Sequence, residues 1–128
     1  MDYGHLRTVD LGLDEAVEKV TATLQEEGFG ILCEIDVKAT LKKKLDIDRG
    51  AYRILGACNP PLAHQALDAE PEVGLLMPCN VVVYVGEDGR TRVGSVDVNK
   101  LLGIVGRDDL QEIAADVTRR LKKAVDAV

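Results

Sequence analysis

The sequence predicts an α+β fold in which two long helices cover one face of an antiparallel-rich sheet. Three observations support this prediction. Apolar residues recur at helical spacing over residues 13–27 and again over 108–127. The run Val81-Val82-Val83-Tyr84-Val85 has the composition of a buried central strand. The pair Asp88-Gly89 follows that run, and such a pair is typical of a tight hairpin turn.

In the first half of the chain, strands and helices alternate. Residues 2–10 mix apolar and polar positions, which predicts a half-buried strand. The helix over 13–27 is expected to end at Gly28. β-Branched residues are frequent over 31–37, so a second strand is expected there. Leucines four positions apart predict a short helix over 38–46.

The second half begins with a predicted third strand over 52–57. Asn59 is a favourable N-cap for a short helix over about 60–69, which starts with proline. The apolar stretch 75–85 contains the central strand, and Pro78 indicates a bulge or a sheet edge within it. These elements bring the number of predicted strands to four before the hairpin turn.

The last two elements complete the sheet and its helical cover. The final helix, over 108–127, is expected to begin with a capping box formed by Asp108 and Gln111. The predicted order is strand, helix, four strands, helix, with short helical inserts. The strand that returns from the hairpin is expected to contain Thr91, Val93, Val96 and Val98.

Composition limits the kinds of protein that this chain can be. Its 128 residues suit one domain, and its formal net charge of −6 repels the phosphate backbone of nucleic acids. Three Tyr and one Phe are too few for a base-stacking platform. No run of about 18 apolar residues is present, and an odd number of cysteines is typical of reduced thiols. We therefore expect a single cytoplasmic domain, 1–128, that binds neither nucleic acid nor membrane.

The segment from Cys58 to His64 is the most suggestive of chemistry. A thiol just before a helix N-terminus faces unpaired backbone N–H groups, which stabilise a thiolate or bind a small anion. The alternative is that Cys58 is a core residue, as free cysteines often are. The candidate ligand-binding residues are Cys58, Asn59, Pro60 and His64. The sequence has no phosphate-binding or dinucleotide motif, so no cofactor is predicted.

Cys79 is the second candidate for thiol chemistry. If the third and fourth strands are neighbours, its thiol approaches that of Cys58, and the two would form a redox pair or, with His64, hold a metal ion. No metal site is predicted, because the sequence lacks a Cys-x-x-Cys pair. Cys33 lies among apolar neighbours in a predicted strand and is expected in the core.

Three polar clusters have two interpretations each. Glu34 and Asp36 could form a carboxylate pair or belong to a solvated sheet face. Asp97 and Asn99 could bind a ligand or serve only turn chemistry. His5 is assigned no role. A basic island could attract an anionic ligand, although lysines on a short helix are usually solvated; it comprises Lys38, Lys42, Lys43, Lys44, Arg49 and Arg53.

Two phrases of the sequence resemble a known family. Cys58-Asn59-Pro60 with Ala63, and Met77-Pro78-Cys79-Asn80-Val81, are similar to motifs of the bacterial and archaeal family named domain of unknown function 302. The resemblance covers about residues 4–105, and Met77 stands where the family usually has Leu. It implies a fold similar to the TATA-box-binding-protein-like class and no settled activity. Shared architecture transfers no DNA-binding role to an acidic, aromatic-poor chain.

The residues favour a small ligand- or protein-binding module whose site lies at the helix start after Cys58. The alternative is a thiol-dependent redox or sulfur-handling enzyme in which Cys58 is the nucleophile and Cys79 the resolving thiol. Dimerisation through a sheet face or edge is also expected, because two helices leave part of a five-stranded sheet uncovered. Whether the protein is an enzyme is left open at this point.

Overall fold

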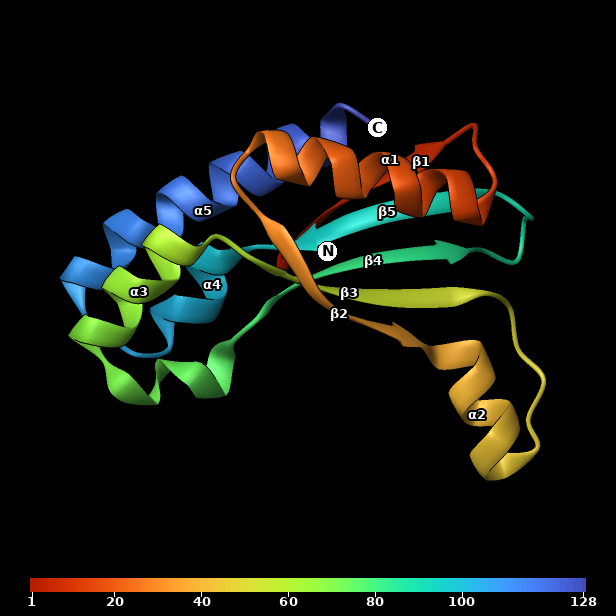
Figure 1. The fold of residues 1–128 in the computed structure, drawn as a ribbon, viewed down its shortest axis with the longest axis horizontal. Coiled ribbons are helices and arrows are strands. Elements are labelled where there is room, and N and C mark those ends of the chain that lie inside the picture. Colours follow the sequence, from red (N-terminus) through yellow and green to blue (C-terminus); the bar gives the residue numbers. More distant parts are fainter.

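In the computed structural model, which describes residues 1–128, the chain forms one five-stranded sheet with helices on one face and at both ends (Figure 1). The predicted order of strand, helix, four strands, helix is confirmed. The elements are β1 (Gly4–Val9), α1 (Leu13–Glu26), β2 (Gly30–Asp36), α2 (Val37–Leu45), β3 (Tyr52–Cys58), α3 (Pro60–Ala69), the 3₁₀ helix η1 (Pro71–Leu76), β4 (Cys79–Val85), β5 (Thr91–Val96), α4 (Val98–Gly103) and α5 (Asp108–Asp126).

Every strand runs antiparallel to its neighbours, in the order β1-β5-β4-β3-β2. β4 is therefore the central strand, as its valine-rich sequence predicts. The tight hairpin to β5 is also confirmed, and its Gly89 has a φ of 77°, a left-handed conformation that glycine adopts without steric cost. The β2–β3 ladder shifts register between Ile31 and Cys33, which leaves Leu32 as the extra residue of a bulge.

One face of the sheet, here the covered face, lies under the long helices α1 and α5 (Figure 1). Each of its buried aliphatic side chains contributes about 1.5–3 kcal/mol to folding. None of the helices combines the length and the apolar composition needed to cross a lipid bilayer. The strands bury Leu55, Val81, Val83 and Val93 on this face, and the helices bury Val20, Leu24, Leu110, Leu121 and Val125 against them.

The two ends of the sheet carry different structures. At one end α3, η1 and α4 pack beside α5, and at the other end α2 projects away from the body of the molecule (Figure 1). The Asp36 side chain accepts a hydrogen bond from the Ala39 amide at 2.9 Å and so caps α2. No side chain of α2 is buried, so its lysines form the solvated surface that one interpretation of the basic island predicts.

The end of β5 differs from the prediction. Val98 does not belong to the returning strand, which stops at Val96. Instead the Asp97 side chain accepts a hydrogen bond from the Lys100 amide, and Asp97 thereby serves as the N-cap of α4. Valine at position 98 suits the buried side of a helix as well as a strand, which is why alternation alone gives the wrong element.

The start of α5 also differs. Arg107, in extended backbone conformation, is the N-cap, and no side chain caps the helix. The predicted capping box is therefore wrong, because Asp108 is already inside the helix, where its carboxylate favours the positive end of the dipole.

Two further expectations about single residues need correction. Cys33 is exposed rather than in the core, because the bulge before it turns its side chain to the face that no long helix covers. The Cys33 Sγ lies 2.6 Å from the position that a Cβ on Gly56 would occupy, so a larger residue at position 56 would displace the thiol. Pro78 marks neither a bulge nor an edge: it precedes the central strand β4, and the Met77–Pro78 peptide bond is cis.

Candidate functional site

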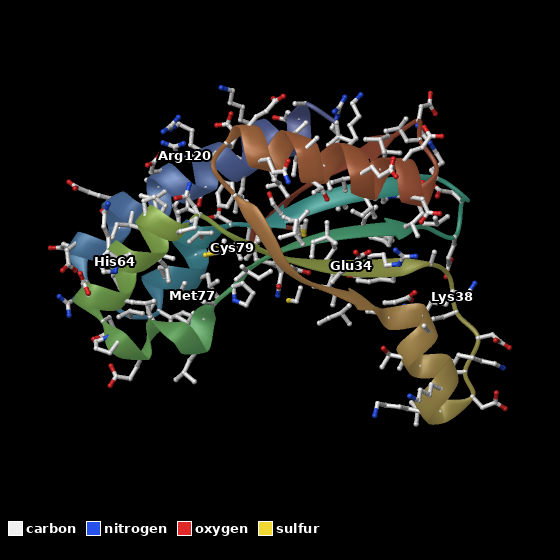
Figure 2. The ribbon with its side chains drawn as sticks, in the orientation of Figure 1. Glu34, Lys38, His64, Met77, Cys79 and Arg120 are labelled. Carbon is white, nitrogen blue, oxygen red and sulfur yellow. The ribbon has the colours of Figure 1, made fainter.

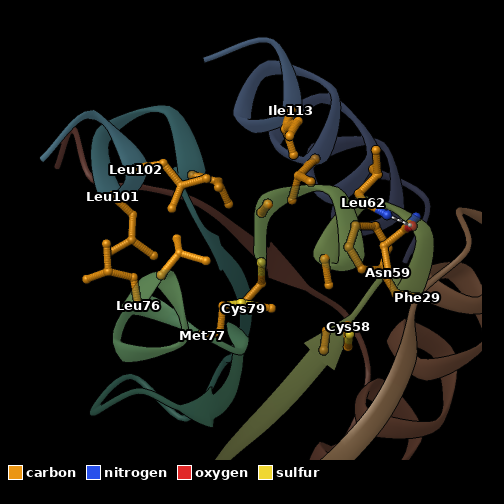
Figure 3. A pocket seen from close by; sticks show the side chains of 16 residues that line it. Phe29, Cys58, Asn59, Leu62, Leu76, Met77, Cys79, Leu101, Leu102 and Ile113 are labelled. Carbon is orange, nitrogen blue, oxygen red and sulfur yellow. Dashed lines mark hydrogen bonds between the residues drawn. The ribbon is translucent and has the colours of Figure 1, made fainter. Parts of the chain in front are cut away.

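An apolar pocket opens where the ends of β3 and β4 meet α3, η1, α4 and α5 (Figure 3). The space open to the centre of a water molecule is about 40 Å³, enough for a few waters or a short alkyl group. Fifteen of the sixteen lining residues are hydrophobic. The lining comprises Phe29, Ala57, Cys58, Asn59, Leu62, Ala63, Ala66, Val73, Leu76, Met77, Cys79, Val98, Leu101, Leu102, Ile113 and Val117.

Asn59 is the polar exception, and both ends of its amide are engaged. Its Oδ1 accepts a hydrogen bond from the Leu62 amide at 3.3 Å (Figure 3), as the predicted N-cap should. Its Nδ2 donates to the Glu27 carbonyl oxygen at 3.4 Å, which ties α3 to the end of α1. The side chain therefore stabilises the wall of the pocket and has little capacity left for a ligand.

The N-terminus of α3 has no free amide to offer an anion. The first two helical residues are Pro60 and Pro61, which have no N–H group. The Leu62 amide donates to Asn59 Oδ1, and the Ala63 amide donates to the Asn59 carbonyl oxygen at 2.9 Å. The donors that make other helix starts into anion sites are thus absent or used.

The two candidate thiols do come together. β3 and β4 are neighbours, with Ala57 opposite Cys79, and both Cys58 and Cys79 line the pocket. Burial raises the pKa of the Cys79 thiol to about 11, and the neighbouring Cys58 thiol adds to this shift. At neutral pH Cys79 is therefore a neutral, apolar part of the wall.

The remaining candidates lie outside the pocket. The side chain of His64 is 77% exposed and lies 3.5 Å from Asp68 one turn along α3, away from the thiols (Figure 2). Pro60 is exposed at the helix start and contributes backbone geometry rather than pocket surface. No three His, Cys, Asp or Glu side chains gather as a group that could hold a metal ion.

The other polar clusters form ion pairs and caps. Arg53 donates to Glu34 at 2.8 Å and lies 3.5 Å from Asp36, so these carboxylates hold an arginine rather than each other. This arrangement raises the pKa of Arg53, chiefly through the hydrogen bond to Glu34. His5, which sequence reasoning left without a role, contacts Asp126 of α5 at 2.7 Å.

Comparison with known proteins identifies this architecture. The model of the family described as domain of unknown function DUF302 matches residues 5–128. The chain belongs to the DUF302 family. The match continues to the C-terminus, beyond residue 105 where the resemblance in the sequence fades, so α5 lies within the DUF302 region.

A solved DUF302 structure has the same fold. The crystal structure of an uncharacterised conserved DUF302 protein from Bacillus stearothermophilus matches with a TM-score of 0.92 and 33% sequence identity. The alignment covers 99% of this chain and 98% of that chain. The predicted α+β class is therefore confirmed over the whole chain.

A further likeness concerns only part of the chain. The hybrid PKS-NRPS synthetase phm1 of a Pyrenochaetopsis species is 39% identical over 67 residues, or 51% of this chain. The chain spans only 2% of the length of that relative. The similarity is thus to a short segment of a very long protein.

Sequence reasoning missed most of the DUF302 pocket wall. Met77, Leu101, Leu102 and Ile113 look like ordinary core positions, because apolar spacing gives no sign that space remains between the packed side chains. One signal was available. Asp97 fits a helix N-cap, and recognising α4 would have added Leu101 and Leu102 to the predicted site.

Proposed function

We propose that this DUF302 protein binds a small uncharged apolar molecule, or the apolar end of a larger one, in the pocket beside Cys58 and Cys79. The main support for this proposal is the lining of the pocket, which is hydrophobic at every position except Asn59. A pocket of this kind gains free energy from each apolar group that leaves water, about 0.8 kcal/mol per methylene. Ligand pockets in proteins are usually apolar with a few polar groups that fix orientation.

The ligand is expected to carry no charge. A charged group in this pocket would lose its hydration and find no partner, because the amides of α3 are absent or engaged and Asn59 is already hydrogen-bonded at both ends. The thiols remain as the weakly polar groups that a ligand would meet. This favours an alkyl or sulfur-containing group over the small anion that the position before a helix suggests.

A series of straight-chain alcohols from ethanol to hexanol tests the proposal by amide NMR titration. Affinity should rise about fourfold with each added methylene until the pocket is full. The shifted amides should belong to the pocket residues. No saturable shift with any alcohol, or shifts confined to the other face of the sheet, would overturn the proposal.

Two matched variants on α3 serve as the control. Ala63→Leu places a larger side chain in the pocket and should abolish binding, whereas Gln65→Leu adds the same side chain on the exposed side of α3 and should leave binding unchanged. Inorganic phosphate, titrated in parallel, should cause no saturable shift at residues 60–63. Binding of phosphate there would instead support the anion site.

A thiol function is the second candidate, because both cysteines line one pocket. In such a reaction the Cys58 thiolate would attack a disulfide substrate and release one thiolate. Cys79 would then displace the second, leaving a Cys58–Cys79 disulfide and two substrate thiols. With a pKa of about 11, Cys79 is ionised in only about one molecule in ten thousand at neutral pH, which makes its step slow.

Alkylation followed by mass spectrometry separates the two functions. The binding function predicts that Cys33, which is exposed, labels first and that Cys79 labels last in the native protein. Rapid labelling of Cys58 alone at mildly acidic pH would favour the thiol function.

A further inference from the structure

The face of the sheet opposite α1 and α5, here the open face, carries an apolar row that crosses all five strands. The ladder register aligns Leu6, Gly94, Val82, Ile54 and Ile35, one residue from each strand. Leu6 is 41% exposed and Ile35 is 46% exposed, so the two ends of the row are open to solvent. Beside the row, the rings of Tyr52 and Tyr84 stack with centroids 5.1 Å apart. An apolar surface of this extent is typical of an interaction site.

The open face ends in two projecting segments of opposite charge. α2 carries Lys38, Lys42, Lys43 and Lys44 and no acidic residue; Lys42 pairs with Asp46 and Asp48 just beyond the helix, and the other three lysines form no ion pair. The segment from the end of α3 into η1 carries Asp68, Glu70 and Glu72; Asp68 lies near His64 and Glu70 near Arg107, and Glu72 forms no ion pair. Both segments also expose leucine, with Leu45 62% and Leu75 87% exposed.

The topology puts these segments at opposite ends of the strands. α2 precedes β3 and η1 precedes β4, and these two strands are antiparallel neighbours. Figure 1 shows that both α2 and the coil of η1 bend away from the layer formed by α1 and α5, and therefore flank the open face.

We propose that the open face binds a second copy of this chain, with the two-fold axis running across the strands. Identical chains that meet through the same face are related by a two-fold axis that lies between the two faces, either along or across the strands. An axis along the strands would bring α2 of both copies, and thus only basic helices, to the same end of the interface. An axis across the strands sets α2 of each copy at the same end as the acidic η1 of the other, so charge selects the second arrangement.

The size of the surface is compatible with a dimer. Strands of six or seven residues, about 4.8 Å apart, give a sheet face of roughly 500 Å². The flanking α2 and η1 bring the contact toward the roughly 800 Å² per partner of a standard interface. The apolar row supplies the centre of the interface, and the charged ends form its rim.

Light scattering coupled to gel filtration over a range of protein concentrations tests the interface. The protein should run as a dimer, and Leu6→Glu and Ile35→Glu should each raise the dissociation constant at least about 100-fold, because each buries carboxylates at an end of the apolar row. Ala115→Glu, on the exposed side of α5, should have no effect. A monomer at every concentration, or a dimer that tolerates both carboxylates on the row, would overturn the proposal.

Charge reversal tests the direction of the axis. The double variant Lys43→Glu/Lys44→Glu and the single variant Glu72→Lys should each weaken the dimer about fivefold, and their combination should recover most of that loss. If α2 meets α2 instead, the lysine reversal leaves the dissociation constant unchanged, because two acidic helices repel as two basic ones do. Circular dichroism of each variant, unchanged from the parent, shows that these exposed substitutions leave the fold intact.

Discussion

The two faces of the sheet alternate in sequence in the same way but differ in what covers them. Leu55 and Ile54 are consecutive residues of β3, yet Leu55 is fully buried under the helices whereas Ile54 lies on the open face. The helices α1 and α5 supply the cover on one side, and no long helix lies on the other. The difference shows that strand periodicity determines which residues share a face but does not determine whether helices, solvent or another chain cover that face.

The largest expected difference in the free energy of unfolding is between two variants, one on each face of the sheet. Leu55→Ala should lower the free energy of unfolding by about 3 kcal/mol, because it leaves a cavity beneath the helices. Ile35→Ala should lower it by less than about 1 kcal/mol when measured at low protein concentration, because its side chain is half exposed there. Urea unfolding measures both values. Equal losses at the two positions would contradict the division into a covered and an open face.

The next effect is the pH dependence of the free energy of unfolding that arises from Cys79, on the covered face near the pocket. The folded-state pKa of Cys79, about 11, exceeds the ordinary value of 9.0. Its neutral thiol therefore stabilises the fold fully below pH 9, and this contribution is lost as the pH rises through 11. The loss should approach about 3 kcal/mol.

The Cys79→Ala variant isolates this contribution from other groups that titrate at high pH. The difference in unfolding free energy between the parent and the variant should shrink between pH 9 and pH 11. A difference that stays constant over this range would show that the thiol is not buried.

A smaller effect is expected at the helix start beside the pocket. Asn59→Ala removes the cap of α3 and the hydrogen bond to the Glu27 carbonyl, and should cost about 1 kcal/mol. Asn59→Ser keeps a capping oxygen and should recover most of that loss. Thermal unfolding of the two variants measures the difference. If serine is as harmful as alanine, the capping bond contributes little and the contact with Glu27 carries the effect.

The sequence was sufficient for the strands and the long helices because their signals are local. The valine run predicts β4, Asp88-Gly89 predicts the hairpin, and the apolar rhythm after Asp108 predicts α5. Elements whose ends depend on a single hydrogen bond are harder to predict from the sequence. α4 begins at the cap formed by Asp97, whereas the alternation of apolar residues predicts that Val98 continues the strand.

The candidate site was predictable only in part. The cap formed by Asn59 followed from its sequence context, whereas the approach of Cys58 to Cys79 depends on the pairing of β3 with β4, which the sequence left open. The exposure of Cys33 did not follow from the sequence, because a single-residue bulge reverses the direction of a side chain. The pocket itself depends on how segments distant in the sequence pack, which no local pattern records.

Crystals of the protein pressurised with xenon would test the apolar pocket most directly, because xenon binds dry apolar cavities and is located by its anomalous scattering. We expect one xenon atom against Cys79, Leu102 and Ile113, and none there in Ala63→Leu. Xenon bound elsewhere on the protein with the pocket left empty would contradict a binding function for this site.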